Sequence, residues 1–419
     1  MYRKTILDNG ITIVTESIPY FSTISMGLWW QAGSRFEQES NNGISHFIEH
    51  MLFKGTQKRT AYDIAREIDA RGGLINAFTG KEYSCLYVKV LKKDMEIAID
   101  ILSDMYKNSL FDDEDMERER YVIAQEIKMV EDSPEEYIYD IFNAYYFCNH
   151  PLGMTILGRQ ENIEMFNRDV LVDYFKRFYS TKRLIITATG RVDHSDFAEK
   201  IKKAFEGSNK SDTKVDDAGI PATGKTINLI ERDLEHTYLC LGTEGLSQMD
   251  KRRYCLYVLN TIIGGSTSSH LFQDIREKRG LVYNIYSYVN CYRDTGTFGI
   301  STSTSEESVI EVLALLRDEI IRIRRDGITD SELEFSKNHI KGNIFMSLES
   351  SDARMGRLAK NEIYFGDYIP IKETLREIDR IKKRDVNEVI EVMLDDMDDI
   401  SLTILGKADI KAIEDIWKN

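Results

Sequence analysis

An internal repeat constrains the fold of this chain more than any other feature of its sequence. The polar segment 209–225, which has almost no apolar periodicity, separates two halves of similar length. Each half contains an apolar stretch with strand character, 83–91 in the first and 296–304 in the second, and two expected helices follow it. This shared order predicts two homologous domains, at 1–208 and 226–419, joined by 209–225 as a linker.

The helices expected after these strands also repeat. They cover 94–111 and 113–127 in the first half, and the matching second helix covers 330–344. Met116 aligns with Leu333 at a spacing of 217 residues. Strands followed by helix pairs predict the α+β class, in which each domain is a mainly antiparallel sheet with helices packed on one face. The alternative, chance similarity between amphipathic helices, does not explain the shared order.

Composition and charge exclude several classes of protein. The 55 lysines and arginines are outnumbered by 70 aspartates and glutamates, which gives a formal net charge of −15 and argues against a nucleic-acid binder. No stretch approaches the roughly 18–20 apolar residues of a membrane span. The five cysteines are scattered, without the CxxC spacing of a metal or redox site, as is typical of a reducing compartment. The N-terminus has no signal or transit pattern, so we expect a cytoplasmic protein.

The densest cluster of reactive side chains lies in Gly43–Gly55, which contains the pattern His46-x-x-Glu49-His50. On a helix, His46 and His50 lie about 40° apart on one face, so that both imidazoles can bind one metal ion. Glu49 lies about 60° to the other side of His46, next to the same ion. The pattern is the inverted form of His-Glu-x-x-His and is known from zinc proteases.

A catalytic zinc site needs three protein ligands and an open position for water, so the two histidines need a third ligand. Glu117, Glu119 and Glu126 on the helix predicted at 113–127 are the candidates. Glu126 is flanked by apolar residues, so we expect it to face inward, where a carboxylate needs a partner such as a metal. Glu119 lies two helical turns earlier on the same face and could orient a ligand. Without further residues, an ordinary amphipathic helix whose histidines are polar residues with satisfied hydrogen bonds remains the alternative interpretation.

The pattern and its surroundings resemble the pitrilysin-type inverted zinc metallopeptidases of the M16 family, specifically the bacterial members of its mitochondrial-processing-peptidase-like branch. The resemblance covers essentially the whole chain. In that family the third ligand follows the second histidine by about 75 residues, and Glu126 follows His50 by 76. The matching blocks are 33–37, 46–56, 76–79, 119–127 and 264–283.

The resemblance implies zinc-dependent hydrolysis of peptides. It implies that His46, His50 and Glu126 hold one zinc ion per chain and that Glu49 is the general base. Glu119 is expected to support catalysis by orienting a ligand or modulating the metal.

The resemblance also implies which residues contact the substrate. Asn76, Ala77 and Phe78 match the family's substrate strand, which can hold a peptide by β-augmentation. Arg276 and Tyr283 match a pair that contacts substrate near the scissile bond, where Tyr283 could donate a hydrogen bond to the developing oxyanion. Local structural roles are the alternatives for all five residues.

The duplicated halves acquire different roles in this family. The second copy is expected to lack the metal site, which leaves one zinc ion per chain. In our alignment Ser268 and Ser269 stand roughly where Glu49 and His50 do, and Asn343 stands where Glu126 does.

The resemblance further implies a dimeric clamshell with an internal chamber. Arg276 and Tyr283 would then serve the partner's zinc, and because this chain carries both residue sets we expect a homodimer with composite sites. The net charge of −15 would favour basic peptides in the chamber. Nucleic acids and membranes are not expected partners, and the physiological substrate is not readable from the sequence.

Two other functions compete with this interpretation. One is a catalytically silent structural subunit of a peptidase-like complex, although silent members of the fold usually lose the His46, Glu49, His50 and Glu126 set. The other is a metal-storage or metal-sensing protein, in which Glu49 would have no role.

Overall fold

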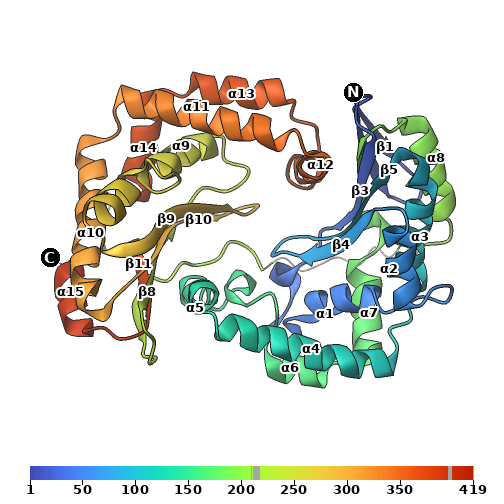
Figure 1. Ribbon diagram of the computed structural model, residues 1–419, viewed down its shortest axis with the longest axis horizontal. Coiled ribbons are helices and arrows are strands. Elements are labelled where there is room, and N and C mark those ends of the chain that lie inside the picture. The colour runs from blue at the N-terminus through green and yellow to red at the C-terminus, as the bar shows by residue number, and fades with distance from the viewer. Residues whose placement is uncertain (209, 211–217, 395–398, 419) are drawn as a thin grey trace. The chain divides into compact units, whose positions relative to one another are not determined.

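The computed structural model describes residues 1–208, 210, 218–394 and 399–418 (Figure 1). The chain forms two compact units, each built from three segments. Of the predicted linker 209–225, residues 209 and 211–217 lie outside the described residues. Unit 1 comprises Met1–Met129, Met154–Ala218 and Met346–Tyr368, and unit 2 comprises Val130–Gly153, Gly219–Phe345 and Ile369–Asn419.

Unit 1 contains a six-stranded sheet in the order β1-β2-β6-β3-β5-β4. All neighbours are antiparallel except β2 and β6, which run parallel. Its strands are β1 (Tyr2–Ile6), β2 (Thr12–Ser17), β3 (Thr23–Trp30), β4 (Leu74–Thr79), β5 (Ser84–Leu91) and β6 (Leu184–Gly190). Its helices are α1 (Ile44–Leu52), α2 (Ala61–Asp69), α3 (Met95–Asn108), α4 (Asp113–Glu131, which runs into unit 2), α6 (Gln160–Met165), α7 (Arg168–Phe178), α8 (His194–Ala204) and α12 (Ser351–Phe365).

Unit 2 contains a five-stranded sheet in the order β7-β11-β8-β10-β9. Its strands are β7 (Ile227–Ile230), β8 (Thr237–Glu244), β9 (Val282–Cys291), β10 (Gly296–Thr304) and β11 (Ser401–Leu405). Its helices are α5 (Pro134–Tyr146), α9 (Arg253–Ile263), the π-helix η6 (Phe272–Lys278), α10 (Val309–Asp326), α11 (Asp330–Ser347), α13 (Ile371–Arg380), α14 (Lys383–Met393) and α15 (Ile410–Lys418). Short 3₁₀ helices are η1 (Ser34–Phe36), η2 (Glu39–Asn41), η3 (Lys92–Asp94), η4 (Pro151–Gly153), η5 (Thr181–Arg183) and η7 (Glu306–Ser308).

The two sheets share one topology, which confirms the predicted α+β duplication. The order β2-β6-β3-β5-β4 of unit 1 matches β7-β11-β8-β10-β9 of unit 2, with one parallel pair at the same place in each. In each unit two helices follow the penultimate strand, α3 and α4 after β5, and α10 and α11 after β10.

This topology corrects the alignment of the second copy's lost metal site. The first α-helix after β3 is α1, and the first α-helix after β8 is α9, so α9 corresponds to α1. Because α9 ends at Ile263, Ser268 and Ser269 lie beyond it and do not replace Glu49 and His50. Periodicity alone could not separate α9 from the short π-helix that follows it.

The units exchange one helix each, which the predicted boundaries 1–208 and 226–419 do not describe. Helix α5, from the first half of the chain, packs on β8 and β11, and α12, from the second half, packs on β3 and β6. Gly242 of β8 permits the close approach of α5, because a Cβ there would lie 2.4 Å from the Phe142 ring. Each sheet therefore has its main helical layer on one face and the exchanged helix on the other.

None of the helices in the described parts of the chain is both long enough and apolar enough to cross a membrane.

Candidate metal centre

The start of α1 is held by a buried carboxylate. Glu37, which is 2% exposed, accepts hydrogen bonds from the backbone N–H groups of Gly43 and Ser45 at 2.8 and 2.9 Å and from Asn42 Nδ2 at 3.0 Å. Gly43 has a φ of 98°, in the left-handed region that favours glycine. A carboxylate at this position satisfies free N–H groups and complements the helix dipole. It thereby fixes where α1 begins.

The structure brings His46, His50 and Glu126 together in unit 1. One ligand atom from each lies within 4.8 Å of the other two. Oε2 of Glu126 is 3.6 Å from Nε2 of His46 and 3.4 Å from Nε2 of His50. Two atoms bound tetrahedrally to zinc at about 2.0–2.1 Å lie about 3.3–3.4 Å apart. Two imidazoles and a carboxylate at these separations fit a zinc ion.

Both the burial and the protonation of His46 suit metal binding. Burial, and secondarily the nearby His50, lowers the pKa of His46 to about 3, so that its imidazole is neutral and its lone pair is available. Its Nδ1 atom is buried and has no hydrogen-bond partner among the described residues. Glu126 is less buried than predicted, at 34% exposure, and Val122 one turn earlier is also 39% exposed.

Glu119 contacts the second histidine on the side away from Glu126. Its Oε2 atom is 2.9 Å from Nδ1 of His50, and its Oε1 atom is 2.6 Å from Nζ of Lys54. Burial lowers the pKa of His50, but the hydrogen bond to Glu119 and the carboxylates of Glu126, Glu119 and Glu49 outweigh it and raise that pKa overall. With Nδ1 held by Glu119, Nε2 of His50 faces Glu126.

Lys54 and Thr79 belong to this site but were missed in the sequence. Lys54 lies four residues after His50, a helical spacing that could have indicated it. Thr79 lies in the matching block 76–79, but no local signal indicates its contact with Glu49, because this contact joins a strand to a helix. Glu117, the remaining candidate on α4, points outward at 71% exposure and pairs with Arg120.

Glu49 lies on α1 beside the cluster. Its Oε2 atom accepts a hydrogen bond of 2.6 Å from the Thr79 hydroxyl. Burial raises the pKa of Glu49, although the Thr79 hydrogen bond and the charge of His50 oppose the shift. A carboxylate with a raised pKa next to a metal position is suited to accept a proton.

The predicted substrate strand is an edge strand. β4 pairs with β5 on one side, and no other strand in the described parts of the chain pairs with it. Phe78 packs edge-on against Trp29, with ring centroids 5.6 Å apart. Asn76 Oδ1 accepts a hydrogen bond of 2.9 Å from the backbone N–H of Ala77, so the Asn76 side chain covers this amide.

Arg276 and Tyr283 lie in unit 2, on η6 and β9. The Arg276 guanidinium lies 5.6 Å from the centre of the Tyr283 ring and 4.5 Å from that of Phe272. Tyr283 is 84% exposed, so its hydroxyl is accessible to a ligand. The structure thus pairs these two residues with each other within unit 2.

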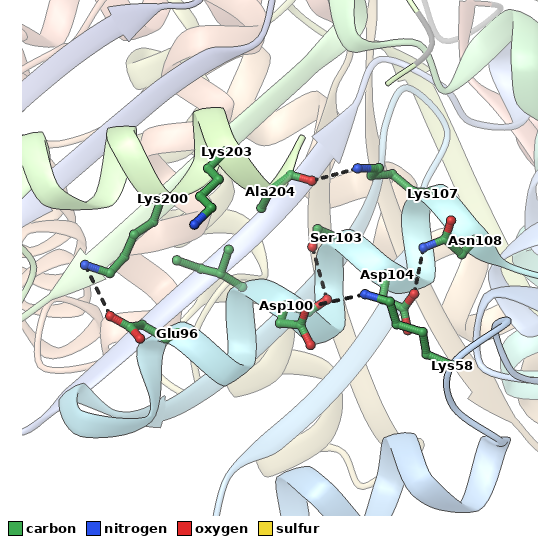
Figure 2. A pocket seen from close by; sticks show the side chains of 11 residues that line it. Lys58, Glu96, Asp100, Ser103, Asp104, Lys107, Asn108, Lys200, Lys203 and Ala204 are labelled. Atoms are coloured by element: carbon green, nitrogen blue, oxygen red, sulfur yellow. Dashed lines mark hydrogen bonds and ion pairs between the residues drawn. The ribbon is translucent and has the colours of Figure 1, made fainter. Parts of the chain in front are cut away.

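Unit 1 contains cavities besides the metal cluster. Figure 2 shows one of about 520 Å³, between α3 and α8, where Lys200 pairs with Glu96 at 3.4 Å and Lys107 donates to the Ala204 carbonyl at 3.0 Å. Among its charged lining residues, Lys58 also pairs with Asp100 at 4.0 Å, and no histidine or cysteine lines it. A second cavity of about 390 Å³ lies beside β4 and is lined by Phe53, Ala61, Ile64, Ala65, Asp69, Gly73, Leu74 and Ile75.

Comparisons with known proteins cover nearly the whole chain. A family model described as Insulinase (Peptidase family M16) matches residues 12–160, and one described as Peptidase M16 inactive domain matches residues 165–340. A Bacillus subtilis protein named uncharacterized zinc protease YmxG is 38% identical, covering 92% of this chain and 94% of that protein. A protein of Streptomyces coelicolor, also named a zinc protease, is 37% identical, covering 94% of this chain and 87% of that protein.

Two crystal structures share the fold. A protease from Helicobacter pylori has a TM-score of 0.90 at 21% identity, covering 97% of this chain and 99% of that one. A peptidase M16 inactive domain from Pseudomonas fluorescens has a TM-score of 0.90 at 19% identity, covering 97% and 98%.

Proposed function

The chain belongs to the M16 family of peptidases, and from this premise we propose that it is a zinc-dependent endopeptidase that hydrolyses unfolded peptides. The arrangement of His46, His50 and Glu126, with Glu49 beside them, carries the proposal. Relatives at 37–38% identity are named zinc proteases, which supports zinc as the metal.

The proposed mechanism assigns a role to each side chain. His46, His50 and Glu126 would hold the zinc ion, and the chemistry it would supply when bound is Lewis acidity. Glu49 would accept the proton of the attacking water and donate it to the leaving amine. Glu119 holds Nδ1 of His50 so that Nε2 faces the metal position.

The substrate is proposed to bind as an added strand on β4. An edge strand offers main-chain hydrogen bonds to any peptide, and these bonds depend little on sequence. Asn76 covers the Ala77 amide and would have to release it to such a peptide. The apolar cavity beside β4 provides space for a side chain of the substrate.

The test compares the wild-type protein with Glu49→Gln on a proteome-derived peptide library, with mass-spectrometric detection of cleavage. We expect zinc-dependent cleavage by the wild type and a loss of at least about a hundredfold in Glu49→Gln. Both proteins should hold one zinc ion per chain, because Glu49 is not a ligand. Equal activity, or none in either protein, would contradict the proposal, and a zinc-loaded but inactive wild type would favour a structural subunit.

We also propose a homodimer in which Arg276 and Tyr283 of one chain serve the zinc site of its partner. The accessible Tyr283 hydroxyl beside Arg276 supports a substrate-contacting role for this pair. Mixing Glu49→Gln chains with Arg276→Ala chains should restore part of the activity that each variant lacks alone, through one intact composite site. Mixed dimers that form but remain inactive would contradict the shared site.

A further inference from the structure

Thr79 ends the edge strand β4 with its side chain turned towards α1. Side chains alternate along a strand, so Ile75, Ala77 and Thr79 lie on the same face. Ile75 and Ala77 pack against the core of unit 1, and Thr79 meets α1. The Thr79 hydroxyl donates to Oε2 of Glu49 at 2.6 Å, whereas the Ser45 carbonyl is 3.5 Å away. Its single hydrogen therefore goes to Glu49.

This contact joins two groups whose relative position matters for the proposed chemistry. A hydrogen bond to a carboxylate is stronger than one between neutral groups. Among the described residues, Thr79 is the hydrogen-bond donor to Glu49, and it contacts Oε2, which leaves Oε1 open. Loss of this bond would leave the carboxylate free to rotate about its terminal torsions, which are broad in glutamate.

We propose that Thr79 is a positioning residue, which fixes the Glu49 carboxylate relative to a peptide bound along β4. A peptide added to β4 takes its register from the backbone of that strand. Glu49 takes its orientation from a side chain of the same strand. Strand β4 thus sets the positions of both the scissile bond and the Glu49 carboxylate. A misplacement of about 1 Å between such groups can cost about a hundredfold in rate. This inference rests on the proposed function.

The test uses Thr79→Val, which keeps the shape of the side chain and removes the donor, and Thr79→Ser, which keeps the donor. In the full-length zinc-loaded protein, Thr79→Val should lower kcat about ten- to hundredfold and change KM by less than about twofold. Thr79→Ser should recover most of the lost kcat. Zinc content should equal that of the wild type in both variants, because Thr79 does not touch a metal ligand in the described structure.

The matched control is Thr12→Val, in strand β2 of the same sheet, which should leave kcat and KM unchanged. Crystal structures give a readout independent of activity: the Glu49 side chain should change orientation in Thr79→Val and keep it in Thr79→Ser.

Three results would overturn the inference: an unchanged kcat in Thr79→Val, an effect on KM or zinc content alone, or no recovery in Thr79→Ser. A wild type without zinc-dependent cleavage contradicts the proposed function instead, and the crystal structures then still decide whether Thr79 orients Glu49. An active wild type with an equally active Thr79→Val contradicts this inference alone.

Discussion

At the scale of single residues, the metal centre depends on charged side chains next to it as well as on its ligands. Lys54 contacts one oxygen of Glu119, and the other oxygen contacts Nδ1 of His50. Burial raises the pKa of Glu119, but its hydrogen bonds to His50 and Lys54 lower that pKa overall. The carboxylate therefore stays ionised and keeps the His50 ring in the orientation that presents Nε2 to the metal position.

Replacing either Glu119 or Lys54 should weaken zinc binding. We expect Glu119→Gln to lower zinc affinity by about ten- to hundredfold, and Lys54→Met by a smaller factor, because Glu119 then lies buried without its cation. Competition with a fluorescent chelator measures both constants. Lys58→Met is the control, since Lys58 is 62% exposed and 4.0 Å from Asp100. Affinities equal to that of the control would show that Glu119 does not support the metal.

At the scale of elements, His270 connects three helices of unit 2. It precedes η6, and its ring nitrogens lie 2.7 Å from Glu319 of α10 and 2.6 Å from Glu332 of α11. Burial lowers the pKa of His270, but its bonds to these carboxylates outweigh burial and the neighbouring Arg322, and its pKa is raised overall. The charged histidine therefore ties η6 to the two helices.

This contact predicts a pH dependence of stability. Because the pKa of His270 is higher in the folded chain than in the unfolded one, its stabilising contribution is complete below about pH 6.5 and is lost as the pH rises through the folded pKa. In thermal unfolding of the zinc-free protein, the advantage of the wild type over His270→Gln should shrink as the pH rises from about 6. His236→Gln, an exposed histidine of the same unit, should leave the pH curve unchanged. A stability advantage of the wild type that grows with pH would contradict a charged His270.

The exchanged helix α5 should carry much of the stability of unit 2. Phe142 is 1% exposed and packs against Gly242 of β8. Phe142→Ala should destabilise the protein by about 3–5 kcal/mol, the usual range for removing a buried aromatic ring. Urea unfolding measures the loss, and Tyr145→Ala on the same helix, where Tyr145 is 46% exposed, is the control. Equal losses in the two variants would show that α5 is not a structural part of that sheet.

At the scale of the whole molecule, the net charge of −15 makes a prediction about substrates. An acidic protein attracts basic peptides over a Debye length of about 10 Å at 0.1 M salt, and this attraction weakens as salt rises. We expect higher kcat/KM for lysine-rich than for glutamate-rich peptides with the same cleavage site. The ratio should fall towards one as the salt concentration increases. A ratio near one at low salt would remove charge as a source of selectivity.

The repeat and the helix α1 can be predicted from the sequence because both depend on local patterns. Helical periodicity predicts that His46 and His50 share one face, and in the structure their ring centroids lie 4.7 Å apart. The repeated order of strands and helices predicts two sheets of one topology, as the structure shows. Backbone hydrogen bonding sets these periods whatever the rest of the chain does.

Only the tertiary structure decides which elements meet. Periodicity marks the apolar face of a helix but not the sheet that will cover it, so the exchange of α5 and α12 leaves no local trace. The contact of Thr79 with Glu49 likewise joins residues 30 positions apart, and neither helical nor strand periodicity predicts such a contact. Local hydrogen bonds therefore determine the elements of this protein from its sequence alone, whereas the packing of distant apolar faces decides how those elements build its candidate site.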